Sequence, residues 1–264
     1  MKPNKNLMEN TDYDTGIRSI IVTNNSLNEN WFSWIYIILI WLSVFPTILL
    51  FQFFFNLFSI WLTPIGVICF LPILIILYFG LFLVFLLFYS KLLLILINLI
   101  HRPREGIFKR NLRDKDYLFF ILRKTIKKFV LKTYNYFPLP WVKIFALKIC
   151  NIKVSYNSGL LDSYIDSDFV EIGENTILGE GSIIMSSMIF GDFLLLKKVI
   201  LKDGCTIGAF SVISPGTIVG EGAILGMGSY TQVNQYLEPK FIHIGRPAKK
   251  KKKIDYDFNL DKNN

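Results

Sequence analysis

A six-residue repeat runs without interruption from Val199 to Thr231. Its aliphatic positions, each six residues after the last, are Leu201, Ile207, Ile213, Val219 and Leu225. A period of six fits neither one face of an α-helix nor a strand that alternates with period two. It fits a chain that makes a short strand and a corner every six residues, because three such sides close one triangular coil of a parallel β-helix. The repeat therefore predicts that the aliphatic side chains point inward and stack from coil to coil.

Two other positions of the repeat are also restricted in residue type. Four residues after each aliphatic residue comes a small or hydroxyl residue: Cys205, Ser211, Thr217, Ala223 and Ser229. One residue after most of them comes a turn-forming residue: Gly208, Ser214, Gly220 and Gly226. We expect the small residues to fit beside the inward stack, and the glycines to supply corner dihedral angles that a Cβ would obstruct. An ordinary β-sandwich of short strands is the alternative.

The same repeat occurs earlier, from Ile172 to Ile184, but in another phase. The step from Ile184 to Leu201 is 17 residues, which is not a multiple of six. We therefore expect residues between Met185 and Lys198 to leave the coil as a loop before the repeat resumes.

The N-terminal half is strongly apolar. Between Trp31 and Ile100 the only charged residue is Lys91. A bilayer core needs about 20 apolar residues per helical span, so this stretch is too long for one span. A break at Thr63–Gly66 predicts a helical hairpin, because three spans would leave almost no room for turns. The expected spans are Trp34–Leu62 and Val67–Tyr89, with Ser90–Ile100 either prolonging the second helix or lying along the interface.

The distribution of cations predicts how the hairpin is oriented. Many cations follow the second span: Arg102, Arg104, Lys109, Arg110, Arg113, Lys115, Arg123, Lys124, Lys127, Lys128 and Lys132. The Thr63–Gly66 connection carries no charge. Because positive loops stay cytoplasmic, we expect an integral membrane protein with the β-helix and both termini in the cytoplasm. A cleaved signal peptide is not expected, because a polar lead containing Glu9 and Asp12 precedes the apolar run.

The connector is predicted to form a basic amphipathic helix over residues 117–134, with an apolar face and a cationic face. Such a helix suits a membrane interface; the alternative is a solvated basic face packed on the β-helix. The prolines at 138 and 140 end it, and Trp141–Cys150 is expected to form a second short helix. The expected domains are a polar N-terminal tail (1–30), the transmembrane hairpin (31–100), the basic connector helices (101–153), the β-helix (154–248) and a polybasic C-terminal tail (249–264).

Charge and cysteine content narrow the possible partners. The formal net charge is +9, concentrated beside the apolar run and in Lys249–Lys253. With a bilayer as neighbour, anionic lipid is a simpler partner for these cations than nucleic acid. The three cysteines, Cys69, Cys150 and Cys205, form no CxxC pair, so neither disulfides nor a zinc site is indicated, and we expect no metal.

Three further motifs complete a recognisable order along the chain. Arg104–Gly106 follows the apolar hairpin, Tyr164–Gly173 precedes the hexads, and Gly245–Ala248 follows them. This order resembles the hexapeptide-repeat acyltransferase superfamily, and within it the membrane-linked C-terminal domain of poly-lysine-type non-ribosomal peptide synthetases and related stand-alone proteins. The likeness covers about residues 35 to 253. It implies a mixed fold, in which the helical hairpin and basic helix are followed by a left-handed parallel β-helix.

The resemblance also implies a chemistry. Such proteins are mostly trimeric acyltransferases with acyl-CoA between neighbouring β-helices, and a histidine beside an extruded loop usually deprotonates the acceptor. In this chain Met188 occupies about that position. The remaining candidates for the catalytic base are His243 and Asp192. His243 lies between two isoleucines, where a structural histidine at the surface is the alternative, and Asp192 falls in the predicted loop, where a solvated aspartate is the alternative.

The donor-binding residues implied by the resemblance lie near the end of the repeats: Gly208, Gly226, Gly245, Arg246, Lys249 and Lys250. The lysine run has three possible roles, namely binding CoA phosphates, attraction to the membrane, or a solvated tail. The sequence thus favours a membrane-anchored acyltransferase that moves an acyl group from acyl-CoA to a hydroxyl or amine near the cytoplasmic leaflet. A non-catalytic trimeric membrane scaffold that has lost the family histidine is the alternative.

Overall fold

The computed structural model describes residues 32–58, 64–137, 139–166 and 168–254. Within these residues the chain divides into two compact units. One unit is helical and consists of the described residues up to Pro103 together with Leu118–Cys150. The other is built of short strands and takes Arg104–Tyr117 and the chain from Asn151 onward. The predicted break at Thr63–Gly66 is wrong for residues 64–66, because these residues begin the helix α3 (Pro64–Ile100); Thr63 itself lies outside the described residues. The predicted N-terminal tail (1–30) and the part of the C-terminal tail from residue 255 also lie outside the described residues.

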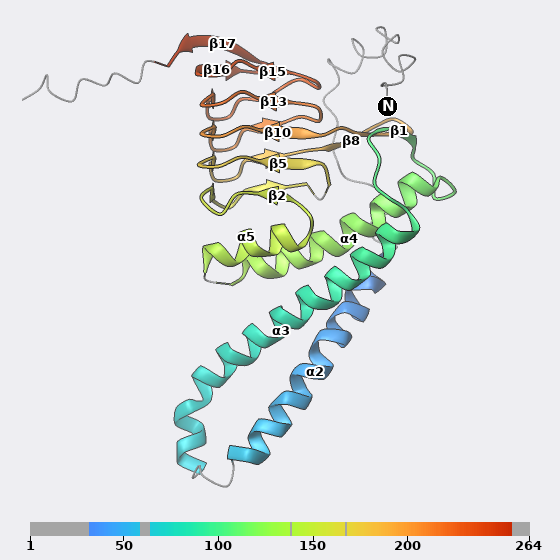
Figure 1. The fold of residues 1–264 in the computed structure, drawn as a ribbon, viewed down its shortest axis with the longest axis vertical. Coiled ribbons are helices and arrows are strands. Elements are labelled where there is room, and N and C mark those ends of the chain that lie inside the picture. Colours follow the sequence, from blue (N-terminus) through green and yellow to red (C-terminus); the bar gives the residue numbers. More distant parts are fainter. Residues whose placement is uncertain (1–31, 59–63, 138, 167, 255–264) are drawn as a thin grey trace, which may run out of the picture. The chain divides into compact units, whose positions relative to one another are not determined.

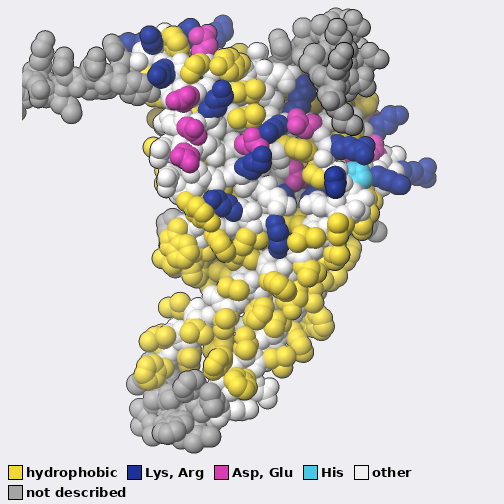
Figure 2. All heavy atoms as spheres, in the orientation of Figure 1, with side chains coloured by type: hydrophobic (Ala, Val, Ile, Leu, Met, Phe, Trp, Pro, Cys, Tyr) yellow, Lys and Arg dark blue, Asp and Glu magenta, His cyan; other side chains and the backbone are white. Residues whose placement is uncertain are grey.

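The helical unit contains the two apolar helices α2 (Trp34–Phe58) and α3 (Pro64–Ile100). Trp34–Asn56 and Phe70–Ile100 are both long and apolar enough to cross a membrane, and α3 continues through the Ser90–Ile100 stretch. Many of their large hydrophobic side chains are exposed, and Figure 2 shows hydrophobic atoms covering this part of the chain. Where the helices have a buried face, it carries small polar side chains among leucines, including Ser43, whose hydroxyl donates to the carbonyl of Leu39 at 2.7 Å.

The connector forms α4 (Lys115–Asn135) and α5 (Pro140–Ile149). The expectation that its cations line an outer face is wrong for three of them, because Arg123, Lys124 and Lys127 are buried. Long cationic side chains tolerate burial when the stem packs and the head finds a polar or aromatic partner. Here the Arg123 guanidinium donates to the carbonyl of His101 at 3.2 Å, and the Lys124 ammonium lies 5.8 Å from the centre of the Phe120 ring.

The second unit is a stack of triangular coils with one strand on each side (Figure 1). All pairing between its coils is parallel, in sheets ordered β15-β13-β10-β5-β2, β16-β14-β11-β6-β3 and β12-β7-β4. The strands are β2 (Lys153–Val154), β3 (Gly159–Leu160), β4 (Tyr164–Ile165), β5 (Val170–Ile172), β6 (Ile177–Leu178), β7 (Ile183–Ile184), β10 (Val199–Leu201), β11 (Thr206–Ile207), β12 (Val212–Ile213), β13 (Ile218–Val219), β14 (Ile224–Leu225), β15 (Tyr236–Leu237) and β16 (Phe241–Gly245).

Three inward columns form the core of this unit, as the repeat predicted. They are Val154, Ile172, Leu201, Val219 and Leu237; Leu160, Leu178, Ile207, Leu225 and His243; and Ile165, Ile184, Ile213 and Thr231. Nearly all of these side chains are buried. The hydrophobic effect thus holds each coil on the next, as in other solenoids.

The residues that leave the coil form a β-hairpin. Its strands are β8 (Ser187–Phe190) and β9 (Phe193–Leu196), in the segment where the sequence predicted a loop. A third strand, β1 (Gly106–Lys109), pairs antiparallel with β9 and makes a three-stranded sheet, β1-β9-β8. Sequence analysis did not predict β1, because a strand whose partner lies on a distant segment of the chain leaves no periodic pattern.

The glycines after the aliphatic positions have a different role from the one expected. The left-handed backbone conformation falls three residues after each aliphatic position, for example at Gly204 (φ 67°) and Gly222 (φ 62°). Gly208 is required for space instead, since a Cβ there would lie 2.5 Å from the backbone nitrogen of Met227 in the next coil. Phe210 occupies one of the left-handed corners (φ 54°), which a large side chain rarely does.

The small residues of the repeat carry hydrogen bonds between coils. Ser158 and Ser211 donate to the carbonyls of Gly173 and Gly226 at 2.7 and 2.9 Å. The Cys205 thiol lies 3.0 Å from the carbonyl of Gly220, and burial raises the pKa of this thiol to about 11. A thiol at these positions therefore stays neutral and packs like the serines, which agrees with a structural role.

Candidate functional site

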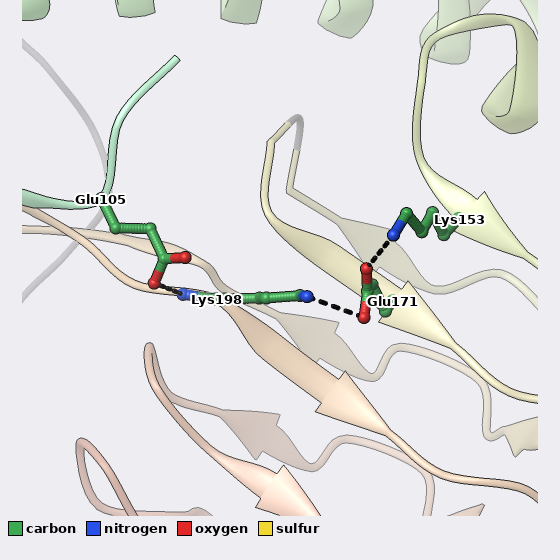
Figure 3. Close-up of polar contacts among 4 residues, drawn as sticks. All are labelled: Glu105, Lys153, Glu171 and Lys198. Atoms are coloured by element: carbon green, nitrogen blue, oxygen red, sulfur yellow. Dashed lines mark hydrogen bonds and ion pairs between the residues drawn. The ribbon is translucent and has the colours of Figure 1, made fainter. Parts of the chain in front are cut away.

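The extruded hairpin is fixed at its root by residues from distant parts of the chain. The carboxylate of Glu105 accepts a hydrogen bond from the backbone N–H of Lys198 at 3.1 Å (Figure 3). The ammonium of Lys198 in turn lies 2.9 Å from Glu171, which also binds the Lys153 ammonium at 2.5 Å. The Arg104–Gly106 motif therefore ties the chain that leaves α3 to the start of strand β10.

Glu171 is stabilised as a carboxylate by this arrangement. Hydrogen bonds from Lys153 and then from Lys198 lower the pKa of its carboxyl, against a smaller opposing effect of burial. Because the folded-state pKa is lowered, the stabilisation is present at neutral pH and is lost as the pH falls through the lowered value. The Lys153 side chain of the Lys153–Glu171 ion pair is largely exposed, so this pair contributes little to the free energy of unfolding.

A buried polar cluster lies where the hairpin leaves the coil. Asp166 is fully buried, and it accepts hydrogen bonds from both the backbone N–H (2.9 Å) and the hydroxyl of Ser187. The Ser186 hydroxyl donates to the carbonyl of Asp168. Charge-assisted bonds of this kind are strong, so Asp166 positions the first residue of β8. Sequence reasoning missed this role, although an aspartate beside the inward Ile165 was a usable signal.

Met188, at the position where the resemblance implies a catalytic histidine, is part of a hydrophobic cluster. Its side chain is buried with Leu195 of β9 and Val233, and Phe190 packs against the group. Close by in sequence, the Lys197 ammonium donates to the side-chain oxygen of Asn234 at 3.0 Å. The position is therefore used to pack the hairpin onto the coils.

His243 lies in the interior of the β-helix, so the expected surface position is wrong. It continues the inward column that contains Ile207, because it pairs in register with Leu225, and it is buried. One ring nitrogen, Nε2, lies 3.2 Å from the carbonyl oxygen of Glu238. Counting in steps of six from Leu201 reaches residue 243, so the repeat itself marks this histidine as an inward residue.

Asp192 lies at the tip of the hairpin, between β8 and β9. Its side chain is 93% exposed and lies 3.9 Å from the Arg110 guanidinium, while its carbonyl accepts the backbone N–H of Arg110 at 2.7 Å. Of the two candidate bases, Asp192 is therefore the one that solvent or a substrate reaches.

Four of the expected donor-binding residues lie close together at one corner of the last coils. Gly208 packs directly beneath Gly226, and Gly226 packs beneath Ile244, the residue before Gly245. The Gly245 N–H donates to the Ser229 hydroxyl at 3.0 Å. The Arg246 guanidinium donates through Nε to the carbonyl of Gly228 at 2.7 Å, which fixes an exposed cation beside this corner.

The other two expected residues lie in a strand, where the sequence suggested a tail. The lysine run forms β17 (Ala248–Lys253), which pairs antiparallel with β16. Lys249 pairs with Ile244 and is exposed, whereas the Lys250 ammonium binds Glu238 and lies 3.8 Å from the centre of the Phe241 ring. Lys249 thus presents its charge to solvent, and the charge of Lys250 is partly offset.

Comparison with known proteins confirms the repeat. Residues 198–231 match the family described as bacterial transferase hexapeptide (six repeats). No curated protein matches the chain. The narrower resemblance to the membrane-linked domain of peptide synthetases stays a prediction.

Solved structures similar to this chain include acetyltransferases and an N-acyltransferase, all of low sequence identity. A hexapeptide-repeat containing acetyltransferase from Vibrio cholerae has a TM-score of 0.43 and 12% identity, over 52% of this chain and 93% of that one. A maltose O-acetyltransferase from Clostridium difficile 630 has a TM-score of 0.42 and 16% identity, over 52% and 88%. AntD, an N-acyltransferase from Bacillus cereus solved with dTDP and 3-hydroxybutyryl-CoA, has a TM-score of 0.29 and 21% identity, over 40% of this chain and 81% of that one.

Proposed function

Because residues 198–231 carry the hexapeptide repeats of a bacterial transferase family, we propose that this protein is a membrane-anchored acyltransferase. Acyl-CoA is the donor, and the acceptor is a hydroxyl or an amine presented near the cytoplasmic leaflet. In the reaction the acceptor attacks the thioester carbonyl, the carbon–sulfur bond breaks, and CoA leaves as the thiol after taking up the acceptor's proton. The coil has the left-handed sense of this family, and the protein acts as a homotrimer.

The observation that carries the donor assignment is the pair of exposed cations, Arg246 and Lys249, at the corner formed by Gly226 and Gly245. Gly208 and Gly226 lack side chains because neighbouring coils pack closely there. Beside them the Arg246 guanidinium is held on the Gly228 carbonyl, and Lys249 is exposed. Guanidinium and ammonium groups are the usual partners of phosphate, so this corner suits the phosphates of CoA.

A non-catalytic scaffold is the second candidate, and the burial of Met188 in the hairpin and of His243 in the β-helix favours it. Met188 and His243 are both buried in packing positions, so neither offers a base to an acceptor. Asp192 is exposed and stands at the tip of the hairpin. If the protein is an enzyme, we expect Asp192 to take the acceptor's proton.

Membrane anchoring rests on α2 and α3. Their length, apolar composition and exposed hydrophobic side chains suit two transmembrane spans. The cations that follow the second span favour an orientation with the β-helix and both termini in the cytoplasm. Cysteine substitutions at Asn4 and Lys251 should therefore be silent to an impermeant thiol reagent in intact cells and react after the membrane is opened. Labelling of the Asn4 variant in intact cells would contradict the two-span topology.

Replacing Lys249 and Lys250 with alanine should weaken acyl-CoA binding about tenfold and leave the protein in the membrane. The affinity falls because the variant lacks two cations near the CoA phosphates. Lys249 is the more accessible of the two to a ligand. Membrane association should persist because the apolar helices alone provide it. Calorimetry in detergent measures the affinity, and flotation with membranes measures the anchoring.

The matched control removes the same charge from the far end of the same strand. Lys252 and Lys253 pair with Ile242 and Phe241, further from the Gly245 corner. Their double alanine variant should keep the wild-type affinity for acyl-CoA. Equal affinity in both double variants would remove β17 from the donor site, and it would strengthen the scaffold candidate.

A further inference from the structure

The three-stranded sheet carries a surface that the proposed acyl transfer does not explain. Its members come from β1, from the turn after it and from β9, and we call them the basic edge: Ile107, Lys109, Arg110, Leu112, Arg113 and Phe193. β1 lies at an outer edge of the sheet. Figure 2 shows Lys and Arg side chains gathered around the segment labelled β1 in Figure 1.

The basic edge combines exposed apolar side chains with exposed cations. Ile107, Phe193 and Leu112 are 48%, 42% and 38% exposed. Ile107 and Lys109 lie two residues apart on β1, so they share one face of the sheet, and Lys109 pairs in register with Phe193. Apolar side chains interspersed with Lys and Arg are typical of surfaces that enter the headgroup region of a bilayer.

Two of the nearby acidic groups, Asp114 and Asp192, already have partners within the protein. Asp114 accepts the backbone N–H of Asp116 at 2.9 Å and so caps the start of α4. Asp192 pairs with Arg110. Lys109 and Arg113 are both exposed, so the edge presents positive charge outward.

The covalent chain limits how far the basic edge can be from a bilayer. Ile107 follows the last residue of α3, Ile100, by seven residues. A fully extended chain spans at most about 3.5 Å per residue, so the edge lies within roughly 25 Å of the end of that helix. This reach includes the headgroup layer if α3 crosses the membrane.

We propose that the basic edge is a lipid-binding surface, which docks the hairpin sheet on anionic phospholipid headgroups of the cytoplasmic leaflet. The inference rests on the membrane anchoring proposed above. Phe193 and Ile107 enter the interface, and Lys109 and Arg113 contact lipid phosphates. Docking holds the hairpin, and with it Asp192, at the membrane surface, so an acceptor delivered to this hairpin is an amphiphile from the same leaflet.

Spin-label accessibility in proteoliposomes tests this surface on the full chain. A label is placed at Phe193→Cys, and a control label at Met227→Cys, which is 72% exposed on a coil corner. Cys150 and Cys205 are fully buried, and Cys69 is replaced by alanine. In phosphatidylcholine vesicles containing phosphatidylglycerol, a water-soluble relaxation agent should reach residue 193 about tenfold less than residue 227.

Charge reversal separates lipid binding from burial within the protein. Adding Lys109→Glu and Arg113→Glu, or omitting phosphatidylglycerol, should restore accessibility at residue 193 to nearly that at residue 227. Reversal of Lys202 and Lys240, both exposed elsewhere on the β-helix, should leave the protection intact. Equal accessibility at the two labels in anionic vesicles would overturn the proposal while the protein still floats with them. A protein that fails to float would instead overturn the anchoring, and this surface with it.

Discussion

Ile213→Asp should unfold the β-helix. Ile213 is fully buried in the third inward column, directly above Ile184. A carboxylate there would meet no cation within the three inward columns, and burying it costs roughly 5 kcal/mol or more. That cost is comparable with the whole unfolding free energy of a small domain, roughly 5–15 kcal/mol. Circular dichroism of the purified variant should show loss of the β-signal and of the cooperative thermal transition.

The neighbouring residue provides the control for this prediction. Val212 lies on the same strand and points outward, with its side chain half-buried. Val212→Asp adds the same charge at the same height of the coil, and it should melt close to the wild type. Wild-type-like melting of Ile213→Asp, or equal damage from both variants, would show that the inward and outward assignments are wrong.

Gly208→Ala should destabilise the β-helix by about 2–3 kcal/mol, because the added methyl group meets a backbone that cannot rotate away. Its Cβ would lie 2.5 Å from the nitrogen and 2.7 Å from the Cα of Met227. Two coils would have to separate locally, and this breaks packing on both sides. Thermal melting followed by circular dichroism measures the effect.

Gly159→Ala is the matched control, since the nearest atom to its Cβ would be a side-chain carbon of Ile177 at 4.0 Å. This variant should melt within a few degrees of the wild type. If the two variants melt alike, close approach of the coils is not the reason for glycine at position 208.

The repeat predicted much of the β-helix because its fold is local. Each inward residue is defined by its place in a count of six, so the columns through Leu201 and Ile213 and the excursion after Ile184 follow from the sequence. The left-handed corners were misplaced, because glycine satisfies two different needs, space and positive φ, and the sequence does not distinguish them.

The site was harder to predict because it depends on contacts between distant segments. β1 pairs with β9, and Glu105 binds the Lys198 N–H, yet neither interaction has a period that a sequence reveals. The lysine run looked like a solvated tail, since charge usually marks an exposed end. It pairs instead with β16 as an edge strand, and all five of its lysines remain exposed to solvent.

The most direct test of the proposed function is a calorimetric titration of the detergent-solubilised full chain with acetyl-CoA and with longer acyl-CoAs. The Gly245 corner with Arg246 and Lys249 predicts saturable binding in the micromolar range for at least one member of the panel. The Lys249 and Lys250 double alanine variant should bind acyl-CoA more weakly, which would locate the binding site at this corner. Absence of binding across the whole panel would contradict the acyl-CoA donor and leave the trimeric scaffold as the function of this protein.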